Sequence, residues 1–557
     1  MSSYMPVNSR HQKRVVQVAA AFRAILITLS VCFFSNRDVT ASIKQKRIER
    51  LNATIENIYT ADYQQMADEN LIAKRDAQTR TIDNIFVAEN PYGTNTTSLY
   101  VYFNTDSATK VSYTVHAEGY PDFTRTAAQN QEYQTEHEFL VLGLIPEQKN
   151  TITLTITDED GAKTTRSITR TGAKLLGTEE TQLEQTVQPS DTTELADGLY
   201  AILGNDSNEQ DFMFYYDTHG VLRGEIPILF YRSHRLLFDD NGLMWFSAST
   251  HTVVGMNNLG KLEKIYDLGD RFILHHDYAL DDDGNIVMLA TDLKRADHAV
   301  QDQIIKLDTS DGTVTQLLDL GEMFPDYKAS TDHSGIDESD PTASNRWDWI
   351  HINTIQLLPD GSALLSARET STIIKVNDIE SNPTLEWMVG ESSVWDGTDY
   401  QDAFLTKDGD FGDTGGQHSI TYEEDSSLPE GQYYIYMFDN NFGYAMTRPD
   451  FDWTVIDGIS TAQSSKDKDS HSQYRKYLID ENAGTYTEVS AFDVPYSPYV
   501  SSAQEVDNNQ ILIDTGMQGV FGMYDTDGNL LAQYKMALNT SYIYRVYQYQ
   551  FKGFYFA

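Results

Sequence analysis

The 557-residue sequence contains one cysteine, Cys32, which excludes a disulfide bond within the chain. Basic residues are also few: 41 lysines and arginines stand against 83 aspartates and glutamates, for a formal net charge of −42. Such a charge repels phosphate backbones and anionic lipids, so it argues against nucleic acid as a partner and against binding to a membrane surface. Any anionic ligand must therefore be held by a small number of local cations.

The sequence has no unflawed apolar run long enough for a membrane span. The best candidate, residues 15–34, is interrupted by Gln17 and Arg23, and only residues 24–34 are continuous. Basic residues precede this run, and the small residues at 39–41 follow it, which is the pattern of a secretory signal peptide. Residues 1–41 are therefore predicted to be a signal peptide or an uncleaved signal anchor, which places the chain outside the cytoplasm, secreted or membrane-anchored.

Two further segments precede the bulk of the chain. Within residues 42–81, Ile48, Leu51, Ile55 and Ile58 recur at helical spacing with charges between them, which predicts a solvated helical stalk or a short coiled coil. Over residues 82–176 the period changes to two, and strands are predicted at 98–103, 110–115 and 151–156. This region is predicted to be a small immunoglobulin-like β-sandwich. A polar linker is predicted at 177–197.

From residue 198 to the end, short apolar strands alternate with Asp/Asn-Gly turns that close hairpins. The turn glycines are Gly242, Gly284, Gly312, Gly361 and Gly528. These turns lack the full twelve-residue ligand pattern of a calcium loop. About six units begin near residues 198, 234, 276, 351, 418 and 501. The sequence therefore predicts an all-β chain in which residues 198–557 form a six-bladed β-propeller.

Three histidines take similar positions in these units. His276 lies eight residues before Gly284 of its turn, His351 lies ten before its own, and His418 opens the next unit. The first strand of a propeller unit lines the central channel, so we expect these side chains to converge there. His234 is expected to face the same channel. His275 is expected to point away from His276, because successive strand side chains alternate.

The residue types around these histidines suit a small oxyanion. Arg368 follows His351 by seventeen residues and is expected on the next strand, where its planar fork matches a sulfate or phosphate. Histidine can act as a nucleophile or carry a proton near neutral pH. Asn353 adds a neutral donor. Three histidines could instead bind zinc, but Arg368 beside a metal dication would be unfavourable, so no metal is predicted.

Several aromatic residues lie near these motifs. Packing between blades explains most of them, and the alternative is that some form the walls of a pocket for a flat aromatic ring. The residues concerned are Tyr231, Trp347, Trp349, Phe442, Tyr496 and Tyr499.

At these positions the chain resembles the bacterial arylsulfate sulfotransferases that use no nucleotide sulfate donor. The resemblance covers residues 83–557. It rests on Asn-Pro-Tyr-Gly at 90–93, Trp-Ile-His-Ile-Asn at 349–353, Ser-Ala-Arg at 366–368, Gln-His at 417–418 and Phe-Asp-Asn at 438–440. The resemblance implies an exported, six-bladed propeller behind an N-terminal sandwich, with no cofactor. A homodimer, which relatives form, and a monomer both stay open.

The resemblance also implies an activity and roles for individual residues. A sulfuryl group would pass from a phenolic sulfate ester to a phenolic acceptor by a ping-pong route. His418 matches the nucleophile that is transiently sulfated. His276 and His351 match histidines that bind the sulfuryl group and assist proton transfer, while Asn353 and Arg368 match residues that hold its oxygens.

The chain departs from the family pattern in two places. The cysteine pair of the enterobacterial branch is missing. The threonine expected near the last blade start is replaced by Val500, with Ser501 beside it as the candidate contact to the sulfuryl group. Two other readings stay open: a propeller lyase or hydrolase that uses histidine and arginine, and a non-enzymatic extracellular scaffold that binds a protein or glycan.

Overall fold

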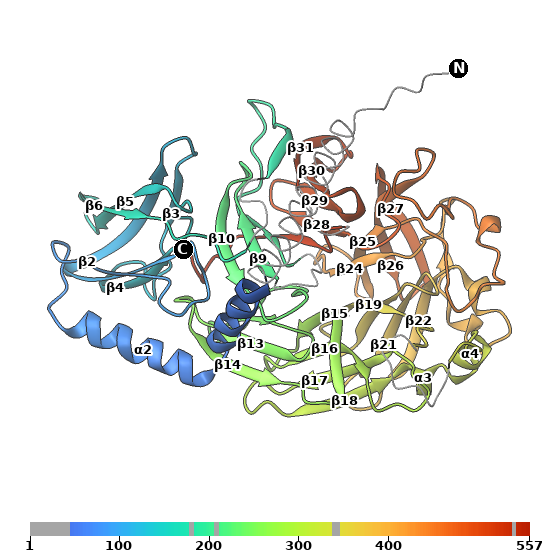
Figure 1. The fold of residues 1–557 in the computed structure, drawn as a ribbon. Helices are drawn as coiled ribbons and strands as arrows, with labels where there is room; N and C mark the ends of the chain where they lie inside the picture. The colour runs from blue at the N-terminus through green and yellow to red at the C-terminus, as the bar shows by residue number, and fades with distance from the viewer. Residues whose placement is uncertain (1–44, 178–182, 205–210, 337–345, 537–541) are drawn as a thin grey trace, which may run out of the picture. The chain divides into compact units, whose positions relative to one another are not determined.

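The structure, a computed structural model, describes residues 45–177, 183–204, 211–336, 346–536 and 542–557 (Figure 1). The chain divides into two compact units, Met1–Glu56 and Asn57–Ala557. The predicted signal peptide or anchor at residues 1–41 lies outside the described residues. Among the residues that are described, no helix has both the length and the apolar character to span a membrane.

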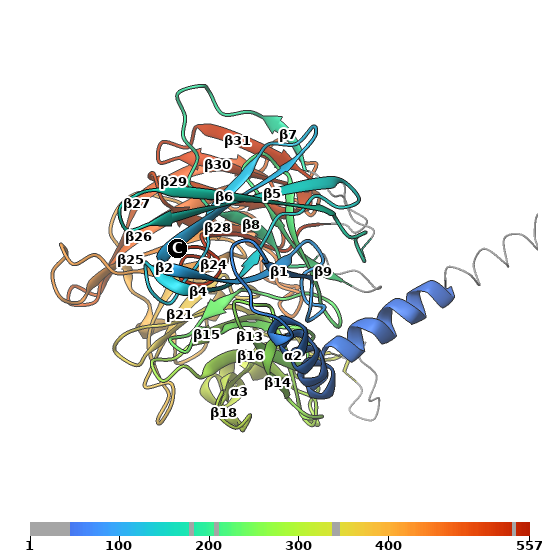
Figure 2. The same ribbon diagram turned by 90° about the vertical axis from the view of Figure 1, so that its left-hand side faces the viewer.

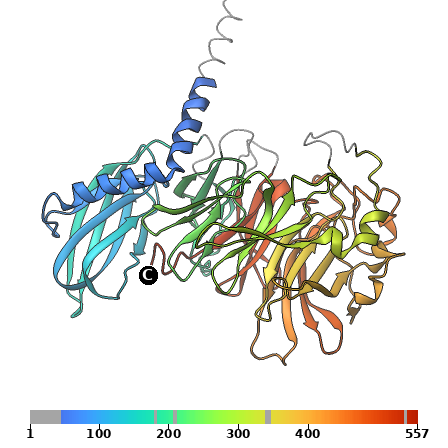
Figure 3. The same cartoon turned by 90° about the horizontal axis from the view of Figure 1, so that it is seen from below.

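The stretch predicted as a helical stalk contains two helices. Residues 45–58 are helical, and α2 (Ala61–Asp76) follows. The helices separate at Thr60, whose backbone is extended and whose Oγ1 accepts a hydrogen bond from Tyr63 N at 3.3 Å, as an N-cap does. α2 runs along the sandwich (Figure 3), where Arg75 pairs with Glu138 of β4 (Gln134–Val141) at 3.0 Å. α2 is thus part of the second unit.

A six-stranded sheet system forms the immunoglobulin-like region. Its path runs from β1 (Phe86–Glu89) through β2 (Leu99–Ala117) and β5 (Lys149–Asp158) to β6 (Lys163–Thr171), and β3 (Phe123–Thr126) and β4 also pair with β2. Two strands were predicted where the single β2 runs. β2 continues through its polar middle because it changes partner there: it pairs with β4 up to Asn104 and with β5 from Thr109 onward.

Six further sheets of four or five strands follow within the described residues (Figures 1 and 2). The first sheet contains β32 (Val546–Tyr549), β8 (Leu199–Ile202), β9 (Phe212–Tyr216) and β10 (Leu222–Pro227), and the second contains β11 (Leu237–Phe238), β12 (Met244–Ser247), β13 (Thr252–Met256) and β14 (Leu262–Asp267). The third contains β15 (Phe272–Leu280), β16 (Ile286–Asp292), β17 (Gln303–Leu307) and β18 (Val314–Asp319), and the fourth contains β19 (Ile352–Leu357), β20 (Ala363–Ala367), β21 (Thr372–Asn377) and β22 (Thr384–Gly390). The fifth contains β24 (His418–Glu423), β25 (Gln432–Asp439), β26 (His471–Asp480), β27 (Thr485–Pro495) and β23 (Thr406–Lys407), and the sixth contains β28 (Ser502–Val506), β29 (Gln510–Thr515), β30 (Val520–Asp525), β31 (Leu530–Lys535) and β7 (Glu184–Val187). Short helices lie between them: α3 (Leu320–Met323), α4 (Pro325–Ser330), η1 (Ser392–Trp395), η2 (Gln401–Ala403), η3 (Trp453–Val455) and η4 (Gly516–Gln518).

The Asp-Gly sequences form the hairpin turns that they predict. In the turn between β15 and β16, Gly284 has φ +79° and its N–H donates to Asp281 O at 3.1 Å. The Asp281 carboxylate accepts from Asn285 N at 2.7 Å. Glycine adopts this backbone conformation without the steric cost of a side chain. The same φ recurs at the other predicted turn glycines, Gly242, Gly312, Gly361 and Gly528.

The first strands of successive sheets lie against one another, since β15 contacts β19, β19 contacts β24, β24 contacts β28 and β28 contacts β32. Apolar side chains fill the space between neighbouring sheets, such as Val287 and Leu289 against Ile352 and Ile355. The prediction of an all-β chain, with a sandwich before a propeller, is confirmed.

The ends of the propeller region exchange strands in a way that the turn pattern did not predict. β7, inside the predicted linker, pairs with β31 as the last strand of the final sheet. β32, near the C-terminus, pairs with β8 and becomes the first strand of the first sheet. Two segments far apart in sequence thereby join the first and last sheets.

Candidate active site

The three histidines lie where the backbone of a first strand is irregular. His276 falls in β15 at a break in its pairing with β16 and has φ +55°. His351 directly precedes β19 with φ +53°, and His418 opens β24 and is followed by Ser419 at φ +58°. Residues with side chains rarely adopt such φ values, and the strain recurs at functional sites in proteins. Regular side-chain alternation does not hold at these positions.

This irregularity overturns the expectation for His275. Its Nδ1 lies 2.9 Å from Nδ1 of His276, and the two rings meet edge to face with centroids 5.1 Å apart. The prediction that His275 points away is therefore wrong. Alternation requires a continuously extended strand, and the positive φ of His276 rotates the two neighbours onto one side.

His276 and His351, which are 75 positions apart in the printed sequence, are brought together, with ring centroids 4.8 Å apart. Both residues are at most 9% exposed. His351 Nδ1 lies 2.5 Å from Oδ2 of Asp348. Burial lowers the pKa of both imidazoles well below the ordinary value, and the positive charge of Arg368 lowers the pKa of His351 further.

His418 has a fixed hydrogen-bonding pattern. Its Nδ1 lies 3.0 Å from Gly416 O and 2.7 Å from Oδ1 of Asn440. The Asn440 amide is oriented by its own Nδ2, which donates to Ser497 O at 2.7 Å and to Val500 O at 2.9 Å. Because both partners of Nδ1 are acceptors, Nδ1 carries the proton and Nε2 carries the lone pair.

The protonation state of His418 suits attack on an electrophile. Burial lowers its pKa well below the ordinary value, the hydrogen bond to Asn440 opposes this, and the charges of Arg545 and Arg368 lower it again. The imidazole is therefore neutral near pH 7, and the lone pair on its Nε2 has the character that a nucleophile needs.

Arg368 reaches the same region from the end of β20. Its side chain is 18% exposed and pairs through Nη2 with Glu369, while Oδ2 of Asp348 lies 3.9 Å from the same nitrogen. Glu369 also accepts a hydrogen bond from Met446 N at 2.6 Å, which fixes the carboxylate. These contacts orient the Arg368 guanidinium before any ligand binds, and the two carboxylates partly balance its positive charge.

Asn353 and Ser501 take part in internal hydrogen bonds. Asn353 Nδ2 donates to Gln417 O at 2.8 Å, so this side chain holds the backbone that precedes His418. Ser501 Oγ donates to Ser497 Oγ at 2.9 Å and accepts from Gly516 N at 3.0 Å. Both residues are fully buried. Neither of these hydrogen bonds joins Ser501 to one of the described histidines.

Two family models match the chain. One, described as arylsulfotransferase (ASST), covers residues 184–545, and the other, described as the arylsulfotransferase Ig-like domain, covers residues 86–173. The first alone spans well over half of the sequence. The chain belongs to the arylsulfotransferase family. The resemblance predicted from the short motifs is confirmed, and the chain is a sulfotransferase that acts on phenolic substrates.

Likeness to solved structures is weak. A streptogramin B lyase is 13% identical with a TM-score of 0.31, covering 64% of this chain and 88% of its own. An auxiliary nutrient binding protein from Bacteroides ovatus is 11% identical with a TM-score of 0.32, covering 80% and 95%. No functional conclusion follows from likeness at this level. No curated protein matches the chain.

The candidate site includes residues that sequence reasoning missed. Asp348, Glu369 and Asn440 lay inside or beside the quoted motifs, yet no periodicity marked them. Arg545, next to β32, donates to Asn353 O at 2.7 Å and lies 3.2 Å from Asp277. Its neighbour Tyr544 lies with its ring centroid 5.9 Å from that of His276. These two residues reach the site only because the C-terminal strand joins the first sheet.

The aromatic residues divide into two groups. Trp347, Trp349 and Tyr496 are buried and bonded within the fold, as packing between blades predicts; Trp349 Nε1, for example, donates to Asp302 at 2.9 Å. Tyr499 is half-buried and lies 6.0 Å from the Arg368 guanidinium, and Phe442 meets its ring edge to face at 5.1 Å. Tyr231 is half-buried beside Arg232 at 4.4 Å.

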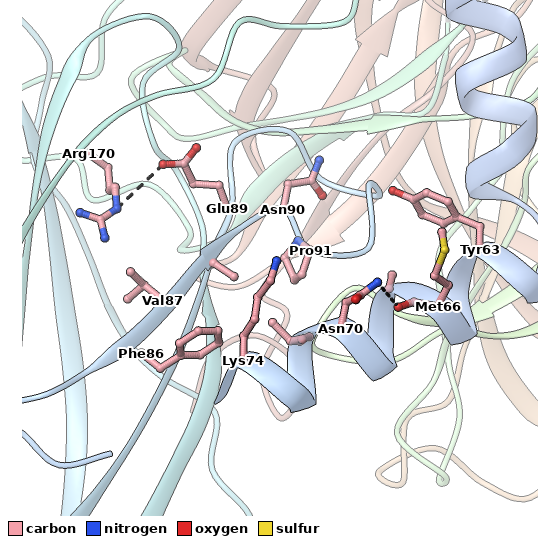
Figure 4. Close-up of a pocket in the computed structure, with 13 residues that line it drawn as sticks. Tyr63, Met66, Asn70, Lys74, Phe86, Val87, Glu89, Asn90, Pro91 and Arg170 are labelled. Carbon is pink, nitrogen blue, oxygen red and sulfur yellow. Dashed lines mark hydrogen bonds and ion pairs between the residues drawn. The ribbon is translucent and has the colours of Figure 1, made fainter. Parts of the chain in front are cut away.

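A separate groove of about 670 Å³ lies between α2 and β1 (Figure 4). Its lining includes Met66, Asn70 and Lys74 from the helix, and an ion pair of Glu89 with Arg170 at 3.9 Å. None of the histidines lines it. Across the described ranges, no cluster of three histidine, cysteine, aspartate or glutamate side chains has the arrangement of a metal site.

Proposed function

We propose that this arylsulfotransferase moves a sulfuryl group from a phenolic sulfate ester to a phenol, without a nucleotide donor, through a sulfohistidine at His418. One observation carries the proposal. Nδ1 of His418 faces two acceptor oxygens, from Gly416 and Asn440, which leaves a neutral Nε2 with its lone pair free. A nucleophile of this kind supports a two-step, ping-pong route with a covalent intermediate.

In the first step Nε2 of His418 attacks the sulfur, the bond from sulfur to the aryl oxygen breaks, and the electron pair leaves with the phenolate. In the second step a phenol oxygen attacks the sulfur, and the pair of the N–S bond returns to Nε2. Charge develops on the three equatorial oxygens, as in phosphoryl transfer, and Arg368 supplies a pre-oriented cation for them.

We also propose an extracytoplasmic location, secreted or membrane-anchored. The support is the sequence of residues 1–41, where basic residues, an apolar run and small residues follow in the order of an export signal. Fractionation of cells that express the full chain checks this: recovery in the cytoplasm alone would contradict it.

The test of the activity uses the purified full chain with p-nitrophenyl sulfate, with and without phenol and with no nucleotide. We expect nitrophenol release that requires phenol and is lost in His418→Asn. The control is His116→Asn, since His116 is exposed on β2 of the sandwich. Nitrophenol release that does not depend on phenol would indicate a hydrolase, and release by His418→Asn at the wild-type rate would remove the proposed nucleophile.

A further inference from the structure

Each of the three histidines has a different partner at Nδ1. His418 faces the oxygens of Gly416 and Asn440, and His276 faces the ring of His275. His351 alone faces a carboxylate, Asp348, at 2.5 Å. Both side chains of that pair are close to nine-tenths buried, at 10% and 12% exposed. A buried carboxylate stabilises an imidazole that gains a proton, so only His351 has a partner suited to proton transfer.

The other carboxylate of the site is already engaged. Glu369 pairs with Arg368 and accepts from Met446 N at 2.6 Å. Asp348 is engaged more weakly: its ion pair with Arg368 Nη2 is long, at 3.9 Å, and its Oδ1 has no hydrogen-bond partner among the described residues. Asp348 is thus directed at His351, whereas Glu369 holds Arg368.

The environment of Asp348 keeps a proton within this pair. Burial raises the pKa of Asp348 to about 6, against the opposing charges of Arg368, His275 and Arg346. Burial and Arg368 lower the pKa of His351. A proton between Oδ2 and Nδ1 is therefore shared by both groups, which titrate as one unit.

We propose that Asp348 is a positioning residue that makes the Asp348–His351 pair the proton carrier of the sulfuryl transfer. This inference rests on the proposed function. When the anionic sulfate ester is bound, its negative charge favours a second proton on the pair, so that one proton lies between Oδ2 and Nδ1 and one on Nε2 of His351. The Nε2 proton passes to the departing phenolate as His418 becomes sulfated. The acceptor phenol then returns a proton to Nε2 as its oxygen attacks the sulfur, so protons balance over the cycle.

The test compares two donors in the full-length enzyme with one acceptor, 1-naphthol. p-Nitrophenolate is a weak base that leaves without protonation, whereas phenolate needs a proton. We expect Asp348→Asn to lower kcat/KM for phenyl sulfate about 100-fold and that for p-nitrophenyl sulfate by less than about fivefold. The matched control is Asp302→Asn. Asp302 is a buried carboxylate that accepts a hydrogen bond from Trp349, the residue after Asp348, and that has no hydrogen bond with a described histidine. It should leave the ratio between donors unchanged.

Equal losses with both donors, or no loss with either, would overturn the proposal, because a merely structural role does not distinguish leaving groups. If Asp348→Asn fails to fold, His351→Gln decides instead: it must show the same selective loss on phenyl sulfate, and an unchanged donor ratio refutes the pair. A wild-type enzyme inactive on both donors would instead count against the proposed function.

Discussion

At the scale of single residues, burial determines how the candidate nucleophile behaves. His418 is 3% exposed, so a protonated imidazole at this position would lack the hydration that stabilises its charge in water. Asn440 and Gly416 O together select the tautomer, since both oxygens accept from Nδ1, and the Asn440 nitrogen is fixed by two backbone oxygens. The nitrogen that we propose as the nucleophile, Nε2, is therefore defined by groups that bond to the opposite nitrogen of the ring.

Asn440→Ala removes three hydrogen bonds and leaves Val500 O buried without its donor, while Ser497 O keeps the hydrogen bond from Ser472 Oγ at 3.3 Å. We expect the free energy of unfolding to fall by about 1–3 kcal/mol and nitrophenol release to fall about 100-fold, since Gly416 O alone then holds the tautomer of His418. Chemical denaturation and turnover of p-nitrophenyl sulfate measure the two effects. The control is Asn441→Gly, because Asn441 bonds to His471 O and has φ +53°, which glycine tolerates. Full activity in Asn440→Ala would show that Asn440 is not needed to fix the tautomer of His418.

At the scale of elements, the irregular first strands decide which side chains meet. A regular β15 would direct His275 and His276 to opposite faces, and the break in its pairing places both on one side. The last sheet contains a buried carboxylate without a partner in the described part of the chain. Asp514, in β29, is fully buried, and neither of its carboxylate oxygens has a hydrogen-bond partner among the described residues.

Because Asp514 is buried, we expect it to lower the free energy of unfolding as the pH rises. Burial raises its pKa well above the ordinary value of 3.8, so the folded chain keeps a proton that the unfolded chain releases above about pH 4. Between this pH and the raised folded pKa, stability declines by up to about 1.4 kcal/mol per pH unit. We therefore expect Asp514→Asn to gain stability relative to wild type from pH 5 to pH 7, measured by urea unfolding.

The matched control is Asp525→Asn in the same sheet, where hydrogen bonds from Asn529 lower the pKa of a half-buried carboxylate. The contribution of Asp525 to stability has the opposite sign. Because its pKa is lower in the folded chain than in the unfolded chain, its ionised form stabilises the fold above the unfolded pKa, and this stabilisation is lost on acidification. This variant should show no gain from pH 5 to pH 7. A stability difference between Asp514→Asn and wild type that does not change with pH would show that Asp514 is ionised in the folded chain.

At the scale of the whole molecule, the net charge of −42 opposes the approach of a sulfate ester. Arg368, partly balanced by Glu369 and Asp348, acts over a short range and does not cancel that field. Salt shortens the range of the field, to about 10 Å at 0.1 M.

We therefore expect kcat/KM for p-nitrophenyl sulfate to rise about two- to tenfold when ionic strength increases from 10 to 150 mM. The KM for the neutral acceptor phenol should stay constant, which serves as the internal control. Steady-state kinetics at several salt concentrations measure both. A fall in kcat/KM with salt would mean that local cations, and not the net charge, govern the approach of the donor.

Much of the architecture could be predicted from the sequence. Asp-Gly turns such as the one at Gly284 act through local backbone preferences, so their spacing indicated sheets of similar length in succession. Ordered motifs around His351, Arg368 and His418 indicated the family. The same reasoning failed at His275, because side-chain alternation assumes a regular strand, and at the middle of β2, because only pairing reveals where a strand changes partner.

Local patterns and motif order were enough to predict the all-β class, the sandwich before the propeller, the arylsulfotransferase family and the candidate set of histidines with Arg368. Only the tertiary structure decided which partner each of these groups has. Asp348 binds His351, Asn440 binds His418, and Arg545 reaches Asn353 through β32. Hydrogen bonds depend on distances between atoms, and the closure of the propeller sets those distances for residues that lie far apart along the chain.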